Sequence, residues 1–114
     1  MSVEIVFDLE TTVQRDGRDI DNSPFEPNNK IVSAHWRMIE DGVLGEAKRA
    51  IFFHNEQDTP DSPDQFIADL SRASCGIAHN AKFDILYLME AGLPVPERMY
   101  CTMIGEYIFA RARS

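Results

Sequence analysis

The stretch "EIVFDLETT" near the start of this 114-residue chain constrains its fold more than any other. Apolar side chains alternate with other residues from Val3 to Leu9, which is the two-residue period of a β-strand. Side chains two residues apart point the same way, so Asp8 and Glu10 share one face of that strand, roughly 6–7 Å apart. The apolar side chains then face a core on the other side.

Two carboxylates this close resist joint ionisation unless a cation lies between them. Sites made only of oxygen ligands suit Mg²⁺ or Mn²⁺. Asp8 and Glu10 are therefore candidate metal ligands. An acidic pair of this spacing is also common at solvated strand ends, so a second element is needed to decide between the two interpretations.

The segment "IAHNAKFDILYL" supplies that second element. Asn80, Phe83 and Asp84 are spaced i, i+3 and i+4, which places them on one side of a helix. Ordinary roles exist for each residue: a helix N-cap, a core aromatic and a solvated helix residue. Asp84, however, stands between Phe83 and the apolar pair Ile85 and Leu86, and apolar surroundings are costly for a charge without a partner.

Turn residues and hydrophobic periods predict the other elements. A long polar loop spans Val13 to Lys30, and strands follow at "KIVSAHWRMI" and "VLGEAKRAIFF", joined by an "EDG" turn. Ser62 and Pro63 open a helix, "CGIAHN" is a short strand, "AKFDILYLMEAG" is a second helix, and "RMYC" is a strand that leads to a last helix opened by Thr102. The order βββαβαβ predicts an α/β fold with a mixed sheet flanked by helices.

Length and charge indicate one domain over residues 1–114 and limit how it meets nucleic acid. The net charge is −8, from 19 acidic and 11 basic residues, so no broad positive surface is available to phosphate backbones. Lys30, Arg37, Lys82 and Arg98 are scattered and are predicted to be solvated surface. Any contact with nucleic acid must therefore be local or assisted by metal ions.

Two further features indicate a cytoplasmic protein without a membrane partner. Cys75 and Cys101 lie far apart and lack partners at metal-site spacing, as expected for free thiols in a reducing compartment. The first ten residues, "MSVEIVFDLE", lack the regions of a signal peptide, and no apolar run is long enough to span a bilayer.

The motifs "VFDLETT" and "HNAKFD" resemble the first (Asp-x-Glu) and second (Asn-x-x-x-Asp) motifs of the DEDD 3′-to-5′ exonucleases. The similarity is greatest to the proofreading domains of family A DNA polymerases, including those of phages. The connecting segments "SPFEPNNKIVS" and "YCTMIGEYI" also look like those of phage-type members, so the resemblance covers essentially the whole chain. It implies a ribonuclease H-like fold and, for a phage protein, action in the host cytoplasm.

The resemblance also implies roles for individual residues. Two Mg²⁺ or Mn²⁺ ions would be held by Asp8, which bridges both, by Glu10 at the ion that carries the attacking water, and by Asp84 at the second ion. Two such ions, about 3.5–4 Å apart, stabilise the entering and leaving oxygens of an in-line attack on a phosphodiester. They also reverse the local field, so an acidic protein can accept a phosphate.

The implied substrate is the 3′ end of single-stranded DNA, with RNA left open. The residues implied as its contacts are Leu9, Thr11, Asn80 and Phe83. Phe83 would offer a stacking or wedging surface, and Thr11 would use its backbone or hydroxyl. A β-branched residue at the end of a strand is an equally simple account of Thr11.

The chain departs from the family at the third motif, which needs a Tyr or His followed by a fourth carboxylate on a helix. No Asp or His follows Asp84, and Glu90, Glu97 and Glu106 do not stand in that pattern. The chain is therefore expected to be an amino-terminal portion of a longer exonuclease or polymerase, with the missing ligand beyond Ser114 or on another chain. The alternative is a catalytically inactive module that binds a protein or nucleic-acid partner.

Overall fold

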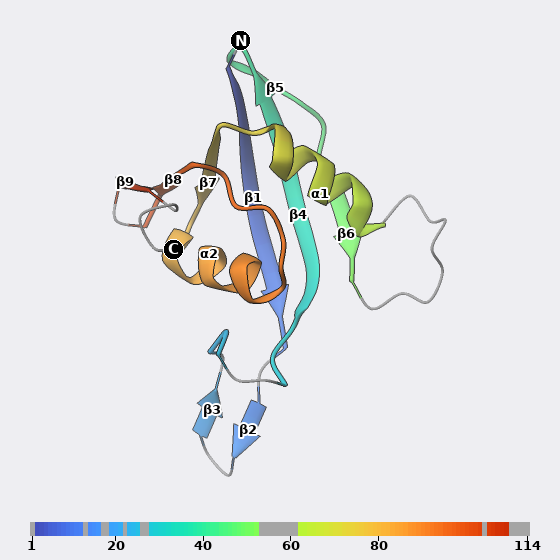
Figure 1. Cartoon of the computed structure of the whole chain (residues 1–114), viewed down its shortest axis with the longest axis vertical. Coiled ribbons are helices and arrows are strands. Elements are labelled where there is room, and N and C mark those ends of the chain that lie inside the picture. The colour runs from blue at the N-terminus through green and yellow to red at the C-terminus, as the bar shows by residue number, and fades with distance from the viewer. Residues whose placement is uncertain are drawn as a thin grey trace.

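A mixed β-sheet with two helices on one face forms the centre of the molecule (Figure 1). The computed structural model describes residues 2–12, 14–16, 19–21, 23–25, 28–52, 62–103 and 105–109. The sheet strands are β1 (Val3–Thr11), β4 (Ile31–Glu40), β5 (Val43–Leu44), β6 (Lys48–Ile51), β7 (Cys75–Ala78), β8 (Arg98–Cys101) and β9 (Glu106–Phe109), and the helices are α1 (Pro63–Arg72) and α2 (Ala81–Glu90). The predicted α/β class is confirmed.

Strand β1 lies at the middle of the sheet, in the order β5-β4-β1-β7-β8-β9, with β6 also pairing with β4. It runs antiparallel to β4 and parallel to β7, which is in turn parallel to β8. Its alternate residues Ile5, Phe7 and Leu9 are buried beneath the helices, as their two-residue period predicts. Phe66 of α1 completes this core, because its ring lies 4.9 Å from that of Trp36 and 6.1 Å from that of Phe7, centroid to centroid.

Both helices begin where the sequence predicts. The side chain of Ser62 caps α1 by accepting a hydrogen bond from the Asp64 N–H at 3.3 Å. Asn80 precedes α2, and its carbonyl accepts the helical bond from the Asp84 N–H at 3.1 Å, but its side chain makes no capping bond. After α2, Gly92 has a φ of +71°, a conformation that favours glycine at a helix end. Neither helix in the described part of the chain has the length and hydropathy to cross a bilayer.

The predicted loop from Val13 to Lys30 contains a short hairpin instead of being wholly irregular. Strands β2 (Gln14–Asp16) and β3 (Asp19–Asp21) pair antiparallel and project beyond the end of β1 in Figure 1. The intervening "DGRD" includes an Asp-Gly pair, which is a frequent hairpin signal that the loop prediction overlooked. Similarly, the strand predicted at "VLGEAKRAIFF" is divided into β5 and β6 around Gly45.

The predicted last helix, opened by Thr102, is wrong. The chain turns after β8 and returns as β9, which pairs antiparallel with β8. The N–H groups of Thr102 and Met103 donate to the carbonyls of Ala78 and His79, so the alignment with β7 continues past Cys101. Gly105, with a φ of +66°, then reverses the chain. The free edge of β8 gives the aromatic and β-branched "EYIF" segment a strand to pair with, which local helix signals could not reveal.

Candidate functional site

The sheet face opposite the helices, called the open face here, carries the first two predicted ligands. Asp8 and Glu10 are both exposed on it, and the register sets Asp8 opposite His35 and Glu10 opposite Ser33. The Ser33 hydroxyl donates a hydrogen bond to Glu10 Oε2 at 3.4 Å. The two carboxylates therefore share one face, as the strand period predicts.

Asp84, the third predicted ligand, is buried in the first turn of α2 and is only 5% exposed. No described donor forms a hydrogen bond with its carboxyl group. Burial, and to a smaller extent the negative charge of Asp8, together raise the pKa of Asp84 to about 7. The structure therefore brings Asp8 and Asp84 within electrostatic reach of each other, although they are 76 positions apart in a 114-residue chain.

Asp84 lies near Asp8 because of the path that the chain takes after β7. Val6 of β1 pairs with Ile77 of β7, so Ala78 at the end of β7 lies level with Phe7, one residue before Asp8. The chain turns there directly into α2, and the first turn of that helix is consequently held near the centre of β1. A short parallel strand followed at once by a helix thus positions Asp84.

The three carboxylates suit a divalent cation by their chemistry, although they do not form a closed cluster. Within the described residues, no three His, Cys, Asp or Glu side chains are grouped closely enough to hold a metal ion. Asp8, Glu10 and Asp84 offer only oxygen, the ligand that Mg²⁺ and Mn²⁺ prefer. A cation beside Asp8 and Asp84 would favour the ionised form of both groups, which repel each other when no cation is present.

The four residues predicted to contact substrate lie around the same carboxylates but differ in exposure. Leu9 is 7% exposed and its side chain belongs to the core, so a substrate could reach only its backbone. Thr11 is half-buried and follows an irregularity in the β1–β4 pairing. Asn80 is exposed just before α2, and half-buried Phe83 lies in its first turn, where its ring is 4.8 Å from that of Tyr87.

A pocket of about 410 Å³ opens beside Asp8, and the sequence analysis missed most of its residues. Its lining includes Val6, Ile77, His35, Arg37, His79 and Thr102. From the sequence, Arg37 is predicted to be one of several scattered surface cations, and the structure shows that it also lines this pocket. The alternation of Ser33, His35 and Arg37 along β4 could have indicated a polar face opposite Asp8, but not the approach of His79 and Thr102.

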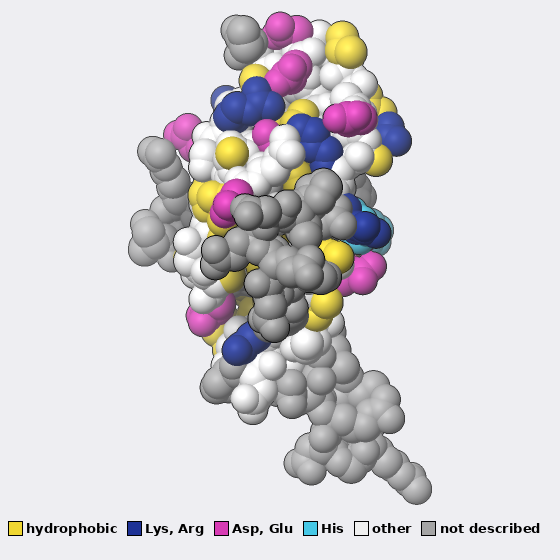
Figure 2. All heavy atoms as spheres, turned by 90° about the vertical axis from the view of Figure 1, so that its right-hand side faces the viewer, with side chains coloured by type: hydrophobic (Ala, Val, Ile, Leu, Met, Phe, Trp, Pro, Cys, Tyr) yellow, Lys and Arg dark blue, Asp and Glu magenta, His cyan; other side chains and the backbone are white. Residues whose placement is uncertain are grey.

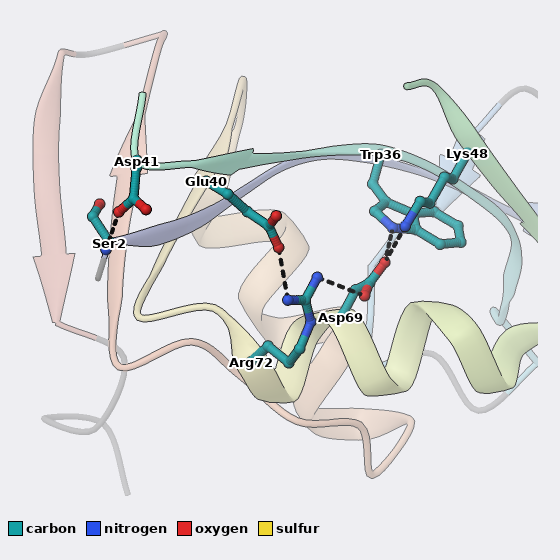
Figure 3. Close-up of polar contacts among 7 residues, drawn as sticks. All are labelled: Ser2, Trp36, Glu40, Asp41, Lys48, Asp69 and Arg72. Carbon is teal, nitrogen blue, oxygen red and sulfur yellow. Dashed lines mark hydrogen bonds and ion pairs between the residues drawn. The ribbon is translucent and has the colours of Figure 1, made fainter. Parts of the chain in front are cut away.

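Asp69, on α1, is a second buried carboxylate with different surroundings (Figure 3). It accepts hydrogen bonds from Trp36 Nε1 at 2.9 Å, from Lys48 Nζ at 3.1 Å and from an Arg72 guanidinium nitrogen at 3.3 Å. Burial acts to raise the pKa of Asp69, but the donors outweigh it and hold the pKa below its ordinary value. Asp69 therefore joins α1 to the sheet and is not a candidate ligand.

No protein-family model matches this chain, and no curated protein matches it either.

Proposed function

We propose that this chain is a ribonuclease H-like, metal-dependent 3′-to-5′ exonuclease that hydrolyses phosphodiesters at the 3′ end of single-stranded DNA. The observation that carries the proposal is Asp84, a buried carboxyl group with no described hydrogen-bond donor whose pKa is raised by burial and by Asp8. A buried carboxyl group without donors lowers the stability of a fold. Carboxyl groups with strongly perturbed pKa values cluster at functional sites, which favours such a role for Asp84.

In this proposal the three carboxylates have separate tasks. Asp8 on the central strand and Asp84 on α2 would hold the divalent cations, and Glu10 would hold the cation that carries the attacking water. Glu10 is oriented by its hydrogen bond from Ser33. The bound cations would supply charge neutralisation at the phosphodiester and a lowered pKa for the attacking water. Phe83, half-buried beside Tyr87, would give the terminal base a stacking surface.

The remaining ligand of a two-metal site has no candidate of the expected type after Asp84. The proposal therefore includes a further segment or chain, such as a polymerase domain, as the source of the fourth carboxylate. The same observation favours one other function, a catalytically inactive module that binds a protein or nucleic-acid partner.

The test follows Mn²⁺-dependent release of mononucleotides from single-stranded DNA labelled at its 5′ end, with an RNA strand run in parallel. Because this chain supplies three of the four expected carboxylates, we expect the wild type alone to shorten the strand from its 3′ end only slowly. Asp84→Asn should lower that rate by at least about 10²-fold, because a further cation ligand is lost. Glu90→Gln is the matched control, since it removes an exposed carboxylate from the same helix. Its rate should equal that of the wild type.

A calorimetric Mn²⁺ titration of the same variants, together with Asp8→Asn, separates the two functions. If the wild type binds Mn²⁺ and Asp8→Asn does not, yet no strand is shortened, the inactive module is the better account. If neither Mn²⁺ binding nor cleavage depends on Asp8 or Asp84, the proposed metal site is wrong.

A further inference from the structure

The pocket beside Asp8 is built from two rows of side chains across the open face. Arg37, Val6 and Ile77 form one row, because Arg37 pairs with Val6 across β4 and β1 and Val6 pairs with Ile77 across β1 and β7. His35 and Asp8 form the next row toward the end of β1. At about 410 Å³ the pocket has the size of a small-molecule site.

The residues that line this pocket are less acidic than the chain as a whole. Acidic residues outnumber basic ones by 19 to 11 overall, yet Arg37 and Lys48 line the pocket with one carboxylate, Asp8, and two histidines. Figure 2 shows basic, histidine and acidic side chains gathered at its right-hand edge. Arg37 could attract an anion to this pocket, although acidic residues predominate in the chain as a whole.

Arg37 is the cation available to that anion. Lys48 is already engaged, because its ammonium lies 3.1 Å from the Asp69 carboxylate. Arg37 is exposed and forms no hydrogen bond or ion pair with any described residue. A guanidinium presents several donors in a fixed plane and matches the geometry of a phosphate group.

The other walls suit the uncharged part of a nucleotide. Val6 and Ile77 are half-buried and offer an apolar floor next to Arg37. His79 lies beyond the end of β7, and its Nδ1 is 3.2 Å from the Thr102 hydroxyl, which orients the imidazole ring. Imidazole rings and apolar side chains are both surfaces against which nucleobases stack or pack.

We propose that this pocket binds a nucleoside 5′-monophosphate, with its phosphate on Arg37 and its base over Val6 and Ile77 beside His79. The choice of a nucleotide as ligand rests on the proposed function, of which this molecule is the product. The site itself lies on the open face beside Asp8 and differs from the predicted contacts at Asn80 and Phe83.

The experiment measures binding of thymidine 5′-monophosphate and of thymidine in EDTA, by amide chemical shifts of the isotope-labelled 13.0 kDa protein. EDTA removes any contribution of divalent cations, so the result does not depend on cleavage. We expect the wild type to bind the nucleotide at least about tenfold more tightly than the nucleoside, as a charge-assisted contact provides. The largest shifts should lie at Val6, Arg37 and Ile77.

Arg37→Ala should abolish the preference for the nucleotide, whereas Arg98→Ala should retain it. Arg98 is the matched control because it is exposed and pairs with Cys75 on the same sheet but does not line the pocket. The proposal is overturned if Arg37→Ala and Arg98→Ala behave alike, if inorganic phosphate competes as well as the nucleotide does, or if the shifts centre on Asn80 and Phe83. Nucleotide binding without any Mn²⁺-dependent cleavage would leave this pocket standing and remove the proposed exonuclease activity.

Discussion

Asp69 and Asp84 lie on the two helices that cover the sheet, at 4% and 5% exposure, yet their surroundings shift their pKa values in opposite directions. Asp69 receives donors from Trp36, Lys48 and Arg72, and its pKa is lowered. Asp84 receives none from the described residues, and burial together with Asp8 raises its pKa to about 7. Burial alone therefore does not define the role of a carboxyl group.

The difference distinguishes a carboxylate that stabilises this fold from one that is available for function. A buried carboxylate with its donors supplied is part of the structure that joins a helix to a sheet. When a carboxyl group is buried without donors, its own ionised form is destabilised, so its charge state responds to pH and to nearby cations. Four predictions test this contrast, from the largest expected effect to the smallest.

The pH dependence of stability should show the largest effect. Asp84 titrates near 3.8 when unfolded and near 7 when folded, so the folded state retains a proton that the unfolded state loses between these values. Its contribution to the free energy of unfolding should therefore fall by roughly 4 kcal/mol as pH rises from about 4 to about 7. Urea denaturation of the metal-free protein across this range, with Asp84→Asn as reference, measures it. If the free energy of unfolding changed with pH in the same way for the wild type and for Asp84→Asn, the contrast between Asp84 and Asp69 would be contradicted.

Removing Asp69, the carboxylate that accepts several hydrogen bonds, should lower the free energy of unfolding by nearly as much. Asp69→Ala leaves the buried Trp36 N–H unpaired and the ammonium of Lys48 without its counter-ion, which should lower the free energy of unfolding by roughly 3 kcal/mol at neutral pH. Because the pKa of Asp69 is lowered, this loss should shrink only as pH falls below about 4. Asp64→Ala, on the exposed side of the same helix, is the control and should cost much less in the same urea titration.

Mn²⁺ should stabilise the protein through Asp84 and not through Asp69. At about ten times its Kd, Mn²⁺ should raise the free energy of unfolding by roughly 1.4 kcal/mol. The gain should disappear in Asp84→Asn and persist in Glu90→Gln. Thermal unfolding with and without Mn²⁺ measures this, and an unchanged gain in Asp84→Asn would show that the cation binds elsewhere.

The ion pair between Arg72 and Glu40, at the solvent-exposed end of the contacts around Asp69, should contribute least to the free energy of unfolding. Arg72 also pairs with Glu40 at 2.7 Å, but both side chains are about half exposed (48% and 51%). Solvated ion pairs of this kind contribute little to stability. Glu40→Gln should therefore change the urea midpoint only slightly. A loss as large as that of Asp69→Ala would mean that the outer pair, and not the buried donors, holds α1 in place.

The sequence by itself determined the features that depend on neighbouring residues. The two-residue period of β1 separates Asp8 and Glu10 from the core face, and Ser62 with Pro63 marks the start of α1. These signals are local because side-chain direction along one element repeats with that element's own period. The α/β class and both helices could be read in this way.

Only the tertiary structure decided which elements meet. The return of the chain as β9 depends on the free edge of β8, and the approach of Asp84 to Asp8 depends on β7 pairing in parallel with β1. Arg37, His79 and Thr102 line one pocket although they lie on segments far apart in the sequence. No local period encodes these distances, because they follow from strand order and register. The shift of the Asp84 pKa follows from them in turn, since burial and the nearby charge both arise when the chain folds.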